Sequence, residues 1–241
     1  MSLKRTVSAV TGFVLLMIMG FPVHQEAEQN NSNPAPALSF FSLLNSAQAK
    51  QPSKKLIAEG KRLYNQNCVF CHQEDAIGKP GVAPSLINKE FLSTASDKFL
   101  KSTIRDGRSG TGMAPFAHLG KSGIDAIVAF LRSHSQLPNI SAKVDAQPEA
   151  HGDPRLGERW FDQICATCHG PKGNGYEAGG TGTAIGKAGF LDKASDGFIR
   201  TTIKQGRSNT RMLGFQGPAG LANLSDQEID DIITYLRSIK H

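Results

Sequence analysis

The sequence predicts an all-α fold made of two tandem helical domains. Three observations support this prediction: apolar residues recur at helical spacing, motifs of the first half return in the second, and no convincing run has the alternating pattern of a strand. The 241 residues suffice for about one or two domains. The composition excludes a collagen-like or coiled-coil fibre and a wholly disordered chain, and four cysteines are too few for a disulfide scaffold of this length.

Residues 1–49 are predicted to be a signal peptide, or an N-terminal anchor followed by a tether. Two basic residues precede the apolar stretch 6–23, as in a secretory signal, although this stretch is slightly short for a membrane helix. A polar segment and a second short apolar patch follow, and a small-x-small cleavage pattern ends at Ala49. We expect cleavage after Ala49, with a retained anchor as the alternative. Both predict a periplasmic protein that is either soluble or anchored to the membrane.

The rest of the chain contains an internal repeat. A Cys-x-x-Cys-His segment at 68–72 returns 97 residues later at 165–169, and further matches lie 99 residues apart. The change of offset places insertions in loops, where they cost little stability. The later matches include Phe91, Phe99, Gly107, Arg108 and Met113 with Phe190, Phe198, Gly206, Arg207 and Met212. We therefore predict one domain at 54–134, a second at 152–241, and a linker at 135–151.

Apolar spacing predicts an amphipathic helix at the end of each domain. Four residues follow the i, i+3, i+4, i+7 pattern in each case, and a capping box at 225–228 marks the start of the second of these helices. The apolar residues are Ile124, Ile127, Val128 and Leu131, and Ile229, Ile232, Ile233 and Leu236. Gly60 and Gly157 are placed to let a helix at the start of each domain approach the terminal helix closely, near Phe130 and Tyr235.

Capping residues predict a further helix in the middle of each domain. Ser96 and Ser195 are suitable N-caps for helices at 97–106 and 196–205. A glycine, the residue favoured just past a helix C-terminus, follows each of these segments.

Each Cys-x-x-Cys-His segment is the attachment signature of c-type haem. Two thiols about one helical turn apart can each add to one vinyl group of a haem, and the adjacent histidine is then carried under the iron as its proximal ligand. The sequence therefore predicts two haem c groups. The predicted residues are Cys68, Cys71 and His72 for the first haem, and Cys165, Cys168 and His169 for the second.

Other uses of paired cysteines fit this sequence less well. The two pairs of a zinc ribbon lie about 15–20 residues apart, whereas 93 residues separate Cys71 from Cys165. A thioredoxin-like redox pair belongs in a βαβ context, which the pattern does not show. Disulfides within the pairs would leave the two following histidines unexplained.

Met113 and Met212 are predicted to be the sixth ligands of the two irons. They are the only methionines after the leader, and they occupy equivalent glycine-containing loops, 41 and 43 residues after the histidines. The usual role of a methionine is to fill gaps in a core, but its recurrence at one loop position favours ligation. Iron held by histidine and methionine has no free position, so it exchanges electrons and does not readily bind oxygen or peroxide.

Arg108 and Arg207 recur beside the methionine loops and leave two interpretations open. A guanidinium can make forked hydrogen bonds to haem propionates, or each residue is a solvated surface arginine. His118, just past Met113, is an alternative ligand that could replace it in one state, but it has no counterpart in the second domain, which disfavours this role. His134, His151 and His241 are expected at the surface.

These motifs resemble those of tandem dihaem class I c-type cytochromes, over nearly all of residues 54–240. Each repeat is similar to a mitochondrial-type cytochrome c domain, and the methionine loop and terminal helix also resemble cytochrome c subunits of bacterial oxidases and molybdenum oxidoreductases. The resemblance implies a small helical domain around each haem, with one haem edge exposed. It also implies that a proline carbonyl steadies the proximal histidine. Residues 84–86 (Pro-Ser-Leu) fit that pattern, whereas residues 183–185 (Thr-Ala-Ile) depart from it.

The predicted function is periplasmic electron transfer without substrate chemistry, as a carrier or as a subunit of a respiratory redox complex. The alternative is a dihaem enzyme of the peroxidase or thiosulfate-oxidising type, in which one axial ligand is displaceable. A haem-based gas sensor is disfavoured because no signalling domain is attached.

The two domains differ in charge. Residues 54–134 carry 12 basic and 7 acidic side chains, and residues 152–241 carry 11 basic and 10 acidic side chains. We therefore expect a redox partner protein with an acidic face, and no nucleic acid.

Overall fold

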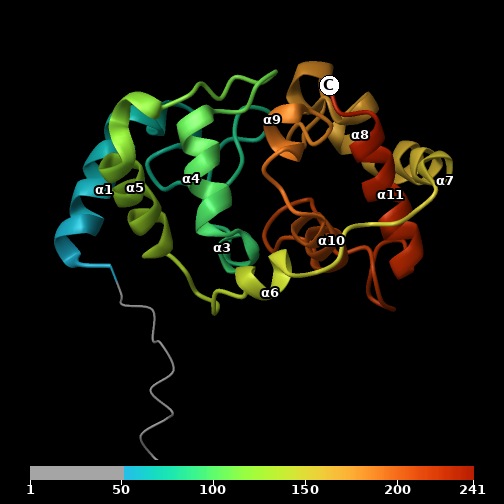
Figure 1. The fold of residues 1–241 in the computed structure, drawn as a ribbon. Coiled ribbons are helices and arrows are strands. Elements are labelled where there is room, and N and C mark those ends of the chain that lie inside the picture. The colour runs from blue at the N-terminus through green and yellow to red at the C-terminus, as the bar shows by residue number, and fades with distance from the viewer. Residues whose placement is uncertain (1–51) are drawn as a thin grey trace, which may run out of the picture. The chain divides into compact units, whose positions relative to one another are not determined.

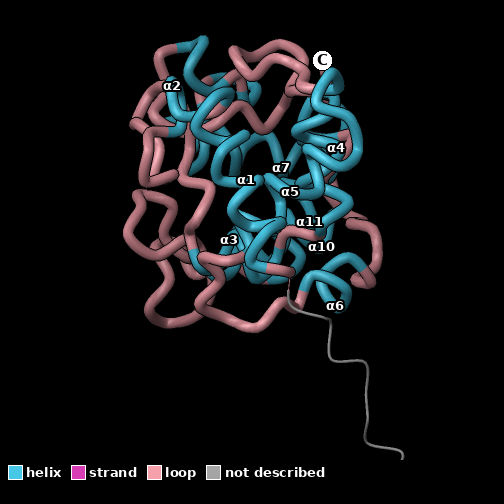
Figure 2. The backbone as a smooth tube through the Cα atoms, turned by 90° about the vertical axis from the view of Figure 1, so that its left-hand side faces the viewer, coloured by secondary structure: helices cyan, strands magenta, loops and turns pink. Residues whose placement is uncertain are grey.

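The computed structural model describes residues 52–241, so the predicted leader lies outside the described residues. Helices joined by loops form this part of the chain, and it contains no strand, which confirms the all-α prediction (Figures 1 and 2). The first repeat holds α1 (Lys54–Asn67), α2 (Val69–His72), α3 (Lys89–Thr94), α4 (Asp97–Asp106) and α5 (Gly120–Arg132). The second holds α7 (Pro154–Trp160), a π-helical turn (Phe161–Cys165), α8 (Ala166–His169), α9 (Ala188–Leu191), α10 (Asp196–Gln205) and α11 (Asp226–Ser238). Within residues 52–241, no helix is both long and apolar enough to cross a bilayer.

The capping residues define α4 and α10 as predicted. The Ser96 hydroxyl accepts the backbone N–H of Phe99 at 3.3 Å, and the Ser195 hydroxyl accepts that of Phe198 at 3.1 Å. Each helix ends at a glycine with a positive φ of 65° or 67°, a conformation that other residues rarely adopt. The predicted capping box at the start of α11 is also present, between Ser225 and Glu228.

In each repeat, the first helix crosses the last helix at a glycine. The pairs are α1 with α5 and α7 with α11 (Figure 1). A side chain at Gly60 would overlap the backbone carbonyl of Ala126, and one at Gly157 would overlap that of Asp231, so the predicted close approach is confirmed. Beside each crossing, two aromatic rings pack together, with centroids 5.2 Å apart in the first repeat and 5.5 Å apart in the second. These ring pairs are Tyr64 with Phe130 and Phe161 with Tyr235.

An arginine of each terminal helix joins two shorter helices of its repeat. The Arg132 guanidinium, on α5, donates to the carbonyl oxygens of Leu92 and Ala95 at the end of α3, and to the Asp97 carboxylate at the start of α4. Arg237 makes the same three contacts in the second repeat, to Leu191, Ala194 and Asp196. Both arginines belong to the sequence repeat. Their partners could not be predicted, because they are mostly backbone carbonyls, which every residue has.

The segment between the repeats is bound to both of them. It contains the short helix α6 (Ser141–Asp145), whose Val144 is buried. Ile140 donates its N–H to the Ser93 carbonyl of the first repeat at 2.8 Å, and Ala150 donates to the Asp196 carboxylate of the second at 2.8 Å. Polar contacts at both ends therefore hold this segment, which had no apolar periodicity to predict a helix.

Four phenylalanines pack where the two repeats meet. Phe99 of α4 lies against its own counterpart, Phe198 of α10, with ring centroids 5.0 Å apart. Phe91 and Phe190 are also counterparts, and they complete the cluster symmetrically. The Phe91–Phe198 and Phe99–Phe190 centroid distances are 6.4 and 6.3 Å. A residue that contacts its own counterpart is the signature of a two-fold interface, here formed inside one chain.

Gly60→Ala and Gly157→Ala are expected to destabilise the haem-loaded protein by about 1–3 kcal/mol each, because the added methyl group overlaps a backbone carbonyl that cannot turn aside. Urea unfolding followed by circular dichroism measures this effect. Gly112→Ala is the matched control, since a side chain there meets open space. An unchanged midpoint for both test variants would contradict the packing described.

Phe99→Ala is expected to lower the unfolding free energy by about 3–5 kcal/mol, because it leaves a cavity among three other rings. We also expect calorimetry to show the two repeats unfolding together in the wild type, in one thermal transition, and separately in the variant, in two. Phe99→Leu provides a milder variant if the alanine protein does not fold. Leu221→Ala is the control, with a side chain that is 65% exposed and an expected change within about 0.5 kcal/mol. A change at Phe99 no larger than that of the control would count against a shared core.

Candidate functional site

The structure places both cysteine pairs at the start of short helices. In the first repeat, Cys68 immediately precedes α2, and its carbonyl accepts the N–H groups of Cys71 at 3.3 Å and His72 at 2.9 Å. In the second repeat, Cys165 ends the π-helical turn and immediately precedes α8, which holds Cys168. All four thiols are free of disulfides. Each repeat thus presents two free thiols about one turn apart, followed directly by a histidine.

The two histidines are oriented by backbone carbonyls. His72 Nδ1 lies 3.0 Å from the Pro84 carbonyl oxygen, and His169 Nδ1 lies 2.7 Å from that of Thr183. A carbonyl oxygen only accepts, so Nδ1 carries the hydrogen and Nε2 is left as the free lone pair that can bind a metal. Thr183 therefore takes the place of the proline at the second site, because the acceptor belongs to the backbone.

Burial keeps both imidazoles neutral and both leading thiols protonated. It lowers the pKa of His72 and of His169, and for His169 the charges of Arg108 and Arg207 lower the pKa further. Burial also raises the pKa of Cys68 to about 11 and that of Cys165 to about 12. Cysteines of thiol redox enzymes have lowered pKa values, so these two thiols are unlike them.

The two methionine loops have the same hydrogen-bonded structure. The N–H of Arg108 donates to the Met113 carbonyl at 2.9 Å, and that of Arg207 donates to the Met212 carbonyl at 2.7 Å. A threonine hydroxyl accepts the methionine N–H in each loop, at 3.2 Å and 3.0 Å. Both methionine side chains are half-buried. The sequence equivalence of the loops therefore extends to their backbone structure, while ligation through sulfur stays a prediction.

The residues present fit a covalently bound haem. Several apolar residues of each repeat pack against the core but remain half-buried, including Val69, Leu86 and Phe116 in the first repeat and Ala166, Ile185 and Met212 in the second. Such residues offer apolar contact to the face and edge of a porphyrin. Together with paired thiols and a free Nε2, they form the donor set that haem c requires.

The structure places the two predicted arginines between the repeats. The Arg108 guanidinium lies 4.8 Å above the ring of Phe190, and that of Arg207 lies 4.9 Å above the ring of Phe91, so each stacks on the opposite repeat. Burial lowers the pKa of each arginine to about 10, which still leaves both charged at neutral pH. Among residues 52–241, no carboxylate lies within ion-pair distance of either guanidinium. Both arginines are therefore half-buried against phenylalanine rings, and the propionate contact stays a prediction.

Polar contacts that the sequence did not predict also cross between the repeats. Ser208, next to Arg207, donates its N–H and its hydroxyl to the Glu90 carboxylate at 3.0 and 2.9 Å. Asn88 donates its side-chain amide to the Ser208 carbonyl at 2.9 Å. These residues lack a distinctive motif, so only their position in the fold reveals their role.

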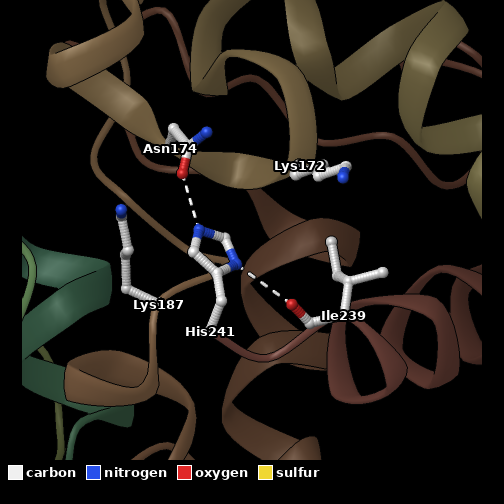
Figure 3. Close-up of a pocket in the computed structure, with 5 residues that line it drawn as sticks. All are labelled: Lys172, Asn174, Lys187, Ile239 and His241. Atoms are coloured by element: carbon white, nitrogen blue, oxygen red, sulfur yellow. Dashed lines mark hydrogen bonds between the residues drawn. The ribbon is translucent and has the colours of Figure 1, made fainter.

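In the described part of the chain, the histidines outside the two Cys-x-x-Cys-His segments lie at the surface. His134, His151 and His241 are exposed, as predicted, and so is His118. The His241 ring contacts the side-chain oxygen of Asn174 at 2.6 Å and the backbone carbonyl of Ile239 at 3.0 Å in a surface pocket that Lys172 and Lys187 also line (Figure 3).

Comparison with known families decides what the repeats are. Residues 55–131 match the family described as cytochrome c oxidase, cbb3-type, subunit III, and residues 155–240 match the family described as cytochrome c. The chain is a tandem dihaem c-type cytochrome. Two haem c groups, one for each repeat, follow from this assignment.

Relatives of this tandem cytochrome include subunits of respiratory complexes. The cbb3-type cytochrome c oxidase subunit CcoP of Rubrivivax gelatinosus is 30% identical over 220 residues, covering 89% of this chain and 64% of the relative. The cytochrome bc1 complex cytochrome c subunit of Mycobacterium leprae is 28% identical over 208 residues, covering 80% and 65%. The chain thus spans less than two thirds of the length of each of these two relatives.

A solved structure shows a weaker likeness to the tandem cytochrome. A reducing HAO-like protein complex of Kuenenia stuttgartiensis matches 76% of this chain and 96% of its own, with 21% identity and a TM-score of 0.47. This TM-score is too low to support a functional comparison.

Proposed function

We propose that this tandem cytochrome transfers electrons, one through each haem, as a periplasmic carrier or as an electron-transfer subunit of a respiratory redox complex. The observation that carries the proposal is that both repeats offer the same donor set. Each has two free thiols one turn apart, a histidine with Nδ1 tied to a carbonyl, and a methionine in a closed loop. Equivalent methionine loops in both repeats disfavour the dihaem enzyme, which needs a displaceable ligand at one iron.

The residues divide into covalent anchors and axial ligands. Cys68 with Cys71, and Cys165 with Cys168, hold the haems through thioether bonds. Through Nε2, His72 and His169 are the proximal ligands, and Met113 and Met212 are the distal ones. The carbonyl bound to each Nδ1 fixes the plane of the imidazole and raises its basicity as a ligand.

Haem c, when bound, supplies one-electron exchange at the iron. His72 with Met113, and His169 with Met212, would hold the two irons, and iron bound in this way would leave no position open to oxygen, peroxide or another substrate. The half-buried apolar residues of each repeat would offer contact to the porphyrin and limit its access to water, which favours a high reduction potential.

Arg108 and Arg207 are proposed to face haem propionates. Each guanidinium is half-buried and stacked on a phenylalanine, and no carboxylate of residues 52–241 lies at ion-pair distance from it. A cation withdrawn from water is stabilised by a nearby anion. The propionate carboxylates are the acidic groups that come with the haems and supply the missing charge.

The partners are proposed to be redox proteins that present an acidic face. The first repeat has the larger excess of basic side chains, 12 against 7, and this charge favours association with an acidic surface. The names of the two curated relatives, an oxidase subunit and a bc1 complex subunit, support a place among respiratory electron carriers. The export predicted for the leader places this exchange in the periplasm, with the chain free or held by its N-terminal segment.

The exported protein is expected to carry the mass of two haem groups. The double variant Cys165→Ala, Cys168→Ala is expected to lose half of the haem, because it removes both thioether anchors of one site and leaves the other intact. Intact-mass spectrometry and the pyridine haemochrome absorbance measure the loss. The double variant Cys68→Ala, Cys71→Ala is the matched control and should retain the other haem. Protein that keeps both haems in either variant would contradict the assignment of the anchors.

Met113→Ala and Met212→Ala are each expected to open one of the two irons. Reduced wild-type protein should bind no carbon monoxide, whereas each variant should bind it at one haem and show a lower potential at that haem, because a thioether ligand raises the potential. Optical titration measures both effects. Leu213→Ala, whose side chain is 51% exposed, is the control beside Met212. Carbon monoxide binding by the wild type would instead favour the dihaem enzyme with a displaceable ligand.

A further inference from the structure

One side chain of the first repeat reaches the proximal segment of the second. Arg108 Nη2 donates to the Ala184 carbonyl oxygen at 2.9 Å. The preceding carbonyl, that of Thr183, accepts the hydrogen bond of His169 Nδ1 at 2.7 Å. Two consecutive carbonyls of one short segment thus bind a histidine of their own repeat and an arginine of the other.

We propose that Arg108 is a positioning residue for the second haem, because it fixes the 183–185 segment that orients His169. This inference rests on the proposed function, in which His169 is the proximal ligand. It extends that function by assigning part of the second haem site to the first repeat. Arg108 acts through the segment and does not coordinate the iron.

Hydrogen bonds within the second repeat also hold the 183–185 segment, so this segment is fixed by both repeats. The N–H of Gly182 donates to the Cys168 carbonyl at 2.7 Å, and the N–H of Ile185 donates to the Gly173 carbonyl at 2.9 Å. A side chain at Gly182 would lie 2.8 Å from His169 Nδ1, which shows how closely the backbone covers the ring. A displacement of the segment therefore moves the acceptor of the histidine directly.

Arg108 is itself rigidly held. Its guanidinium stacks on Phe190 at 4.8 Å, and its backbone N–H is bonded to the Met113 carbonyl. Gly189 lets the two backbones meet here, because a side chain at Gly189 would lie 2.7 Å from the Arg108 carbonyl carbon. One residue thereby links the methionine loop of the first repeat to the proximal segment of the second.

The counterpart arginine does not make this contact. Arg207 Nη2 donates instead to the Thr202 hydroxyl of its own repeat at 3.3 Å, and its guanidinium stacks on Phe91 and Phe198. Both arginines are half-buried between the repeats and carry the same charge. They differ in the hydrogen bond to the proximal segment, which Arg108 makes and Arg207 does not. Within residues 52–241, the Arg108 side chain donates through Nη2 alone, so the bond to Ala184 is compatible with a propionate contact.

The test compares Arg108→Met with Arg159→Met in the full dihaem protein. Arg159 is an exposed arginine of α7, so its replacement removes one positive charge from the second repeat away from the proximal segment. Paramagnetic NMR detects the hyperfine-shifted ring resonances of His169, and following them during a redox titration assigns the potential of the second haem. We expect these resonances to move in Arg108→Met but not in Arg159→Met. We also expect the second haem of the two variants to differ by about tenfold in redox equilibrium constant, which equals about 59 mV for one electron.

Arg108→Lys separates position from charge and keeps the test open if Arg108→Met does not fold. It preserves the charge but not the planar fork, so it should also move the His169 resonances. His169 resonances that stay unmoved in both Arg108 variants, or that move equally in Arg159→Met, would overturn the inference. If His169 of the wild type shows no hyperfine shift, the ligand assignment fails first, so the two failures are distinguishable.

Discussion

The packing of four phenylalanines between the repeats is the contact on which the rest of the arrangement depends. Each repeat alone buries the modest core of a small helical domain, and the shared rings extend that core across the boundary. Because the cluster is symmetric, it packs the α3–α4 region of the first repeat against the equivalent α9–α10 region of the second. The stacked arginines and the Ser208–Glu90 contacts surround this cluster and exist only because the rings hold the repeats in contact.

Symmetry in the packing does not produce two identical sites. The repeats share the cysteine pair, the tied histidine and the closed methionine loop, which are local features of each copy. They differ in what the neighbouring repeat contributes. Burial lowers the pKa of both histidines, and the charges of Arg108 and Arg207 lower that of His169 further. The Arg108 side chain also bonds to the segment that orients His169. These differences give two sites with the same predicted ligands different surroundings, and the surroundings of a metal site tune its potential.

Bonds to the backbone explain why the second repeat tolerates its departures from the first. The carbonyl of Thr183 takes the place of the Pro84 carbonyl, and the arginines of the two terminal helices bond to carbonyls at the ends of α3 and α9. In such contacts the backbone conformation at the acceptor residue matters more than its side chain. A substitution that preserves the backbone conformation therefore preserves the hydrogen bond.

The sequence by itself determined the features that depend on neighbouring residues. Serine caps, the capping box and apolar spacing predicted the main helices. The repeated Cys-x-x-Cys-His pattern predicted haem attachment. Both kinds of signal act within about one turn of helix, so neighbouring residues are enough to reveal them. Tertiary structure decided what depends on residues far apart in the chain. The phenylalanines matched across the repeats gave no sign that they meet each other, and Arg108 had two open interpretations. Its environment arises only when a second repeat packs against the first, which no local pattern encodes.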